Sequence, residues 1–110
     1  MAGPILAEFE FYVMLAVVHL GDDAYGALVR QEIETRTDRP VSIGALYTTL
    51  ARLEAKGLLT LRTVKSEAGQ RGRARRYCRL TSAGTQAVQQ SATMVSRMMR
   101  GLKLAPIRSK

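Results

Sequence analysis

Basic side chains are concentrated in one short segment of the 110-residue chain. Between Arg62 and Arg79 stand seven basic residues and a single acidic one, and the centre of this stretch reads Ala68-Gly-Gln-Arg-Gly-Arg-Ala-Arg-Arg76. Guanidinium groups donate paired hydrogen bonds to phosphate oxygens. The short apolar runs Leu58–Leu61 and Tyr77–Leu80 flank the glycine-broken segment, which is the pattern of two strands and a turn. The segment predicts a β-hairpin with a phosphate-binding tip, the wing of a winged helix.

The charge of the chain is divided unevenly between its two parts. Residues 1–60 hold five basic and eight acidic residues, whereas residues 61–110 hold twelve basic residues and one acidic residue, for a net charge of +8. A basic half of this kind predicts a polyanionic partner, because phosphate contacts release counterions over one continuous patch. The alternative is a solubility device or a disordered basic tail. Strand and turn signals within the basic segment favour the first interpretation.

Two helices are expected on the N-terminal side of the third helix and the basic hairpin. The first runs from about Leu6 to Leu20, and its almost continuous apolar character suits a helix buried on more than one face. Asp22 or Asp23 then caps the second helix, which runs to about Thr37.

A third helix precedes the hairpin directly, and Ser42 is its expected N-cap. Its apolar stripe consists of Ile43, Leu46, Leu50 and Leu53. Its other side carries Gly44, Thr48, Ala51 and Arg52, with Tyr47 on the flank. Small residues and hydrogen-bond donors suit a helix that lies against a duplex. The alternative is an ordinary capped amphipathic helix.

The remaining signals complete a fold that is mainly α with a small β-hairpin. Gly57 is placed as a C-terminal cap, and Thr81 caps a last helix that continues past Gly101 to about Leu104 and is stopped by Pro106. We therefore expect a winged helix-turn-helix in residues 1–80, a C-terminal helix in residues 81–104 and a loose tail in residues 105–110.

The last helix carries apolar residues at heptad spacing. They are Val88, Ala92, Val95, Met98, Met99 and Leu102. Because no element follows to cover this stripe, it predicts a dimer interface. The alternative is that the helix folds back on its own domain.

Residues for other chemistry are scarce. Cys78 is the only cysteine and is expected in the core, while His19 is the only histidine and is expected to be structural or exposed. We predict no metal site and no cofactor, because neither residue has ligand spacing. A glycine-rich phosphate loop and a nucleophile with a base are also missing, so an enzyme is not expected. The longest apolar run, Phe11–Leu20, is about half of a membrane span, and a cytoplasmic protein is expected.

Three blocks of residues follow one another in a characteristic order. They are Ala24-Tyr-Gly26, then Val41–Tyr47 with Leu50–Leu58, and finally Arg71–Tyr77 with Leu80–Gly84. Over roughly residues 10–90 this order resembles the PadR family of bacterial transcriptional regulators. Short members of that family consist of a winged helix-turn-helix and one C-terminal dimerisation helix, so the resemblance implies this architecture.

The resemblance implies a homodimeric repressor that binds a palindromic operator in double-stranded DNA and releases it when a small-molecule effector binds. Together with the helix pattern it assigns DNA binding to Tyr25, Ser42, Gly44, Tyr47, Thr48, Arg52, Arg71, Arg73, Arg75 and Arg76. In this assignment Tyr47 contacts the DNA backbone, and the four last arginines are wing contacts. The chain has no tryptophan, so the stacking of planar ligands on tryptophan by drug-binding relatives is not expected.

On this interpretation residues 43–56 enter a major groove, and Gly44, Thr48 and Arg52 provide most of the specificity. An effector would change the angle between the two C-terminal helices, with Met94, Met98 and Met99 as an adaptable lining. The alternative for these methionines is plain dimer packing. Two other functions stay open: a winged-helix docking module whose basic surface meets an acidic protein, and an RNA-binding protein. The second is disfavoured because aromatic residues for base stacking are few.

Overall fold

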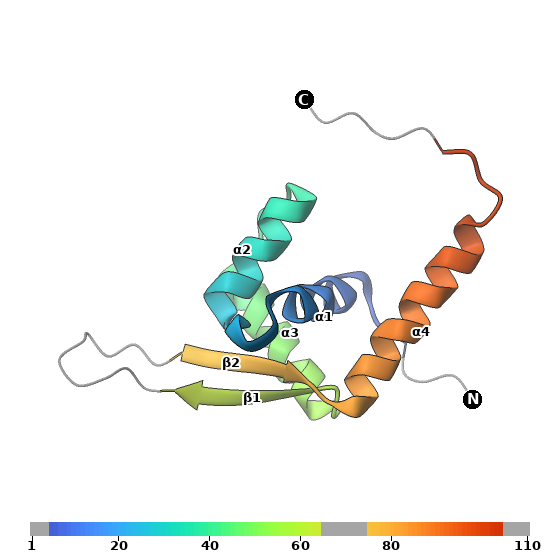
Figure 1. The fold of residues 1–110 in the computed structure, drawn as a ribbon. Helices are drawn as coiled ribbons and strands as arrows, with labels where there is room; N and C mark the ends of the chain where they lie inside the picture. Colours follow the sequence, from blue (N-terminus) through green and yellow to red (C-terminus); the bar gives the residue numbers. More distant parts are fainter. Residues whose placement is uncertain (1–4, 65–74, 105–110) are drawn as a thin grey trace.

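The computed structural model describes residues 5–64 and 75–104. The elements are α1 (Glu8–Leu20), the 3₁₀ turn η1 (Gly21–Asp23), α2 (Gly26–Thr37), α3 (Ile43–Ala55), β1 (Leu59–Val64), β2 (Arg75–Leu80) and α4 (Ser82–Met99). Figure 1 shows the helices around α1, with the hairpin and α4 extending toward different sides. The predicted mainly helical fold with one small hairpin is confirmed.

Helix α1 is the centre of the core, as its apolar sequence predicted. It contacts α2, α3, α4 and β2, and Val13, Met14, Ala16 and Val17 are buried on it. Leu46, Leu50 and Leu53 of α3 are fully buried against the same cluster. Four elements thus pack on one helix, and their relative positions depend on it.

The predicted caps of α3 and α4 are confirmed. The Oγ of Ser42 accepts a hydrogen bond from the amide of Ala45 at 3.1 Å, and the Oγ1 of Thr81 accepts one from the amide of Gly84 at 3.0 Å. At the other end of α3, Gly57 adopts φ +75°, and its N–H donates to the carbonyl of Glu54. This left-handed residue turns the chain from α3 directly into β1.

Three expectations about helix boundaries and faces were wrong. Asp22 and Asp23 lie in η1, and Tyr25 precedes α2 without a side-chain cap bond. Ile43 is 48% exposed, because the core covers α3 only from Leu46 onward. Helix α4 ends at Met99, before the predicted Leu104, since Arg100 leaves helical geometry and Gly101 has φ +85°.

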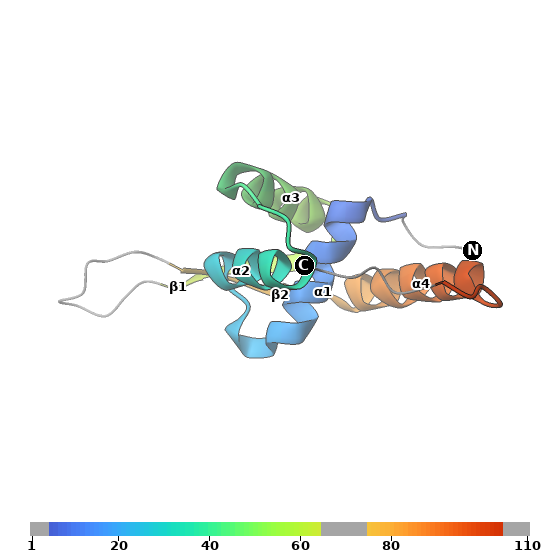
Figure 2. The ribbon, with the colours of Figure 1, turned by 90° about the horizontal axis from the view of Figure 1, so that it is seen from above.

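The two strands pair antiparallel with Leu59 opposite Leu80 and Val64 opposite Arg75. The segment before α2 lies along β2: the amide of Cys78 donates to the carbonyl of Ala24 at 2.7 Å, and Tyr25 forms an isolated antiparallel bridge with Tyr77. Figure 2 shows the hairpin and α4 extending in opposite directions. The predicted tip, residues 65–74, lies outside the described residues. Within the parts that are described, no helix is long and apolar enough to cross a membrane.

A partly buried ion pair joins the end of α3 to the start of α1. The Nζ of Lys56 donates to Glu10 at 2.6 Å, and the other carboxylate oxygen accepts from the amide of Ala7 at 2.9 Å. Burial alone would raise the pKa of Glu10, but the hydrogen bonds from Lys56 and Ala7 outweigh it and lower this pKa below the usual value of a glutamate. The pair therefore stabilises the fold at neutral pH and loses its effect as the pH falls through the lowered pKa.

Replacing Lys56 by methionine is expected to lower the free energy of unfolding by about 1–2 kcal/mol at pH 7, because the buried carboxylate loses a charged donor. The difference from the parent protein should shrink as the pH falls and Glu10 becomes protonated. Denaturant titrations at pH 7 and pH 3 measure it. Arg39→Met is the control, since its pair with Glu8 is exposed and should contribute little. A loss equal at both pH values would contradict the assignment.

Candidate nucleic-acid interface

The outer face of α3 carries small and polar side chains. Ser42, Gly44, Thr48 and Arg52 are exposed, because the leucines of the opposite face are buried in the core. A Cβ placed on Gly44 would meet no atom within 4 Å. The fold therefore does not require glycine at this position, and the side chains of this face have room to meet a partner.

Tyr47 lies between α3 and its neighbours. A Cβ on Gly26, at the start of α2, would stand 2.2 Å from the Tyr47 hydroxyl oxygen. The guanidinium carbon of Arg76 lies 5.8 Å from the centre of the Tyr47 ring. Gly26 thus leaves the space that Tyr47 fills, and Tyr47 connects α3 to the hairpin. The sequence blocks contained Gly26 and Tyr47, but nothing in their spacing indicated this contact.

Two tyrosines and two arginines form a stack at the base of the hairpin. The rings of Tyr25 and Tyr77 are 5.4 Å apart and tilted by 59°. Arg75 lies 4.5 Å above the Tyr25 ring, and Arg62 lies 5.6 Å above that of Tyr77. A hydrogen bond with Tyr77 and the nearby Tyr25 raise the pKa of Arg75. Because a ring face attracts a cation without neutralising it, both guanidinium groups keep their charge for an anionic ligand.

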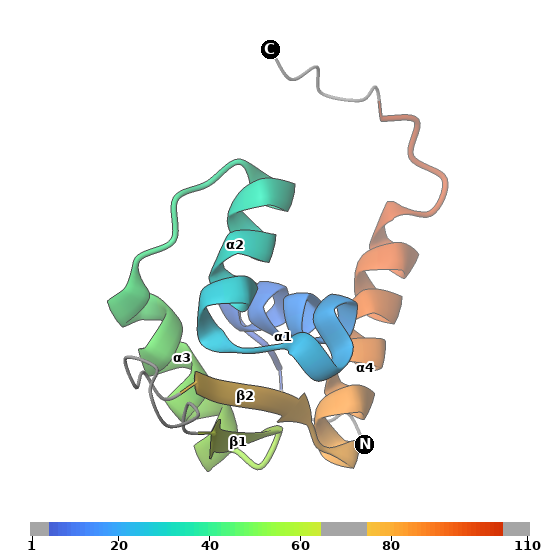
Figure 3. The ribbon, with the colours of Figure 1, turned by 60° about the vertical axis from the view of Figure 1, so that its left-hand side comes forward.

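The structure brings most of the predicted DNA-binding residues close to one another. Tyr47 and Arg76 connect α3 and β2, and Tyr25 and Arg75 connect the start of α2 to the same strand. Figure 3 shows α3 beside the hairpin, and α3 contacts β1 directly. Arg71 and Arg73 lie outside the described residues. Ile43, which was expected on the apolar stripe, has an exposed side chain at the start of the outer face of α3.

Helix α4 presents a separate apolar surface. Its exposed members are Met94, Val95, Met98, Met99 and, just beyond the helix, Leu102. Val95 and Met99 line a shallow groove together with Phe11 and Leu15 of α1 and the predicted interface residue Ala92. Val88 lies in the protein's own core at 9% exposure, so little of its side chain is left for a partner.

The lone cysteine and histidine do not form a reactive site. Cys78 is buried, as predicted, and burial raises the pKa of its thiol to about 11. A thiol of this kind is protonated at neutral pH and is a poor nucleophile. His19 is exposed at the end of α1. Over residues 5–64 and 75–104, no group of three or more histidine, cysteine or acidic residues is arranged to hold a metal ion.

Comparison with known families and structures agrees with this architecture. The model of the transcriptional regulator PadR-like family matches residues 14–90. The transcriptional regulator Rv3488 of Mycobacterium tuberculosis (strain ATCC 25618 / H37Rv) is 39% identical over 90 residues, which cover 80% of this chain and 79% of that protein.

Two solved structures have a similar fold. A PadR-like transcription factor from Bacteroides fragilis superposes with a TM-score of 0.69 and 27% identity, covering 82% of each chain. The complex structure of hsRosR-SG gives a TM-score of 0.66 and 25% identity, covering 87% of this chain and 78% of the other. The similarity therefore extends over most of the chain, in sequence and in fold.

Proposed function

The chain belongs to the PadR-like family of transcriptional regulators, and from this premise we propose that it is a homodimeric repressor that binds a palindromic operator. The family is one of DNA-binding regulators, not of enzymes. The observation that carries the proposal is the contact between Tyr47 and Arg76. It joins the exposed face of α3 to the cationic base of the hairpin, which gives a helix to read bases and arginines to hold phosphates next to one another.

In the proposed complex α3 lies in a major groove of duplex DNA. Gly44 allows close approach, Thr48 and Arg52 meet base edges, and the exposed Ile43 supplies an apolar group for a thymine methyl. Arg75 and Arg76 hold adjacent phosphates or reach into the minor groove, and Arg71 and Arg73 are proposed to extend this contact. Phosphates are alike at every base pair. The specificity is therefore assigned to α3 and most of the affinity to the hairpin.

We propose α4 as the dimerisation element. Its exposed apolar residues and the groove beside α1 are suited to a second copy, and a two-fold dimer places two recognition helices about 34 Å apart, one turn of DNA. A small-molecule effector would act by rotating one α4 against the other. Met94, Met98 and Met99 are exposed on this helix, and flexible methionines adapt to varied ligands.

Selection of bound fragments from the genome of the source organism tests this proposal. We expect enriched sites with two inverted half-sites whose centres are about 10 base pairs apart or a multiple of that spacing. Sedimentation of the protein at micromolar concentration should give a dimer. A lack of enriched sites would contradict the operator, and a monomer that binds one half-site would contradict the dimer.

Replacing Gly44 by alanine is expected to weaken operator binding about tenfold while the fold is kept. The added methyl group meets no protein atom, and alanine is the better helix former by up to about 1 kcal/mol. A loss of affinity would therefore come from a clash between the added methyl group and DNA. Thermal melting and operator titration measure the two effects. Unchanged affinity for the operator would show that Gly44 does not approach DNA closely.

A further inference from the structure

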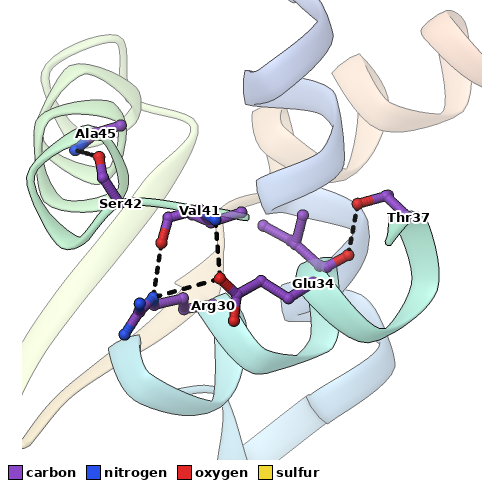
Figure 4. Close-up of polar contacts among 7 residues, drawn as sticks. Arg30, Glu34, Thr37, Val41, Ser42 and Ala45 are labelled. Atoms are coloured by element: carbon purple, nitrogen blue, oxygen red, sulfur yellow. Dashed lines mark hydrogen bonds and ion pairs between the residues drawn. The ribbon is translucent and has the colours of Figure 1, made fainter. Parts of the chain in front are cut away.

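Val41, the residue before the N-cap of α3, is held at both of its backbone polar groups by side chains of α2. The Nε of Arg30 donates to the Val41 carbonyl at 2.7 Å, and the Val41 amide donates to Oε2 of Glu34 at 2.8 Å. The same Glu34 oxygen lies 3.8 Å from Arg30 Nε. Figure 4 shows the three residues as one closed arrangement between α2 and the start of α3.

The remaining part of Val41 is fixed as well. Its side chain is 6% exposed and belongs to the hydrophobic core. The next residue is the N-cap Ser42, whose carbonyl accepts from Leu46 at 3.1 Å and whose Oγ accepts from Ala45. A displacement of Val41 would therefore move the whole first turn of α3, which includes Gly44.

We propose that Arg30 and Glu34 are positioning residues for the recognition helix, and that they contribute to operator specificity through Val41 and not through the bases. This inference rests on the proposed function of α3. Base readout requires each side chain to meet its base edge with good hydrogen-bond geometry, whereas phosphate contacts tolerate small shifts. Loosening the start of α3 should therefore weaken binding to the operator much more than binding to random DNA.

A second pair on the same helix provides a matched control. Glu32 and Arg36 form an ion pair with the same spacing of four residues, but neither contacts Val41 in the described hydrogen bonds. Glu34→Ala and Glu32→Ala each remove one negative charge and one such pair. Any general effect of charge or of helix stability on DNA binding should be alike in the two variants.

The test compares these variants with the parent protein in two measurements. The first is amide hydrogen exchange of residues 41–46 in the DNA-free protein, which should become faster in Glu34→Ala and stay unchanged in Glu32→Ala. The second is the ratio of affinities for a selected operator and for random duplex. This ratio should fall about tenfold in Glu34→Ala, as expected for a lost hydrogen bond to a charged group, and less than about twofold in Glu32→Ala.

The conservative variant Glu34→Gln separates positioning from charge. Glutamine keeps an oxygen that can accept from the Val41 amide, so most of the affinity ratio should be retained. Equal exchange rates in Glu34→Ala and Glu32→Ala would overturn the proposal, and so would an equal loss of operator and random affinity in Glu34→Ala. If exchange responds as expected but the parent protein prefers no duplex, the positioning of α3 stands and the proposed operator binding is refuted.

Discussion

Replacing Arg75 and Arg76 together by alanine is expected to weaken binding to the operator and to random duplex similarly, by about 100-fold or more at low salt. A dimer would lose four charged donors. Since a hydrogen bond to a charged group contributes about 1.5–3 kcal/mol, the loss of only two contacts already corresponds to such a factor. The plot of log affinity against log salt concentration should become less steep by about one unit for each lost phosphate contact.

Arg79 supplies the control on the same strand. Its side chain is 77% exposed and faces Asp22 at 3.6 Å, near the end of β2 opposite to Arg75. Arg79→Ala removes the same charge as Arg75→Ala, but we expect less than about a twofold change in affinity. If the slope of log affinity against log salt concentration is the same in the double variant as in the parent protein, the base of the hairpin does not contact phosphates.

Replacing Gly84 by alanine is expected to lower the free energy of unfolding by about 3 kcal/mol or more, because a rigid part of the backbone must move. A Cβ at this position would stand 2.0 Å from the carbonyl oxygen of Leu58. That oxygen also accepts a hydrogen bond from the amide of Thr81 at 3.1 Å, and the Thr81 hydroxyl donates to the carbonyl of Gly57 at 2.7 Å. The start of α4 is thus docked directly on the turn after α3.

The measurement for Gly84→Ala is thermal or denaturant unfolding at a fixed protein concentration, since the stability of the proposed dimer would depend on concentration. The melting temperature should fall by about 10 °C or more. Gly44→Ala is the control, because it places the same methyl group on a helical glycine with open space around it. Equal stabilities of the two variants would show that the contact between Gly84 and Leu58 is not close in solution.

The parts of the fold that were predictable depend on neighbours in the chain. A hydroxyl at Ser42 or Thr81 satisfies an amide three residues later, and Gly57 is free to adopt a positive φ. These are signals of residue type at short range. The alternating apolar residues of β1 and β2 likewise lie near each other in sequence, so the hairpin could be expected from local pattern.

The parts that were not predictable depend on residues distant in sequence. Lys56 pairs with Glu10 across 46 positions, and Gly84 meets the carbonyl of Leu58. Ile43 matched the apolar spacing of α3, but burial depends on which elements cover a turn, and the first turn is uncovered. Thr49, a polar residue that the apolar spacing does not include, is buried in α3 together with the three leucines. Spacing gives the face of a helix and not the extent of its contacts.

The candidate interface shows the same division. The exposed outer face of α3 followed from its helical period, whereas the placement of its first turn by Arg30 and Glu34 did not, because an arginine and a glutamate four residues apart are typical of any exposed helix. The contact of Tyr47 with Gly26 also depends on how α2 and α3 cross.

The most direct measurement is a titration of the protein, at physiological salt, with a duplex recovered from genomic selection and with a shuffled duplex of the same composition. We predict that two subunits bind the recovered duplex at least about 1,000-fold more tightly than the shuffled one. Equal affinities for the two duplexes would contradict sequence-specific regulation by this protein.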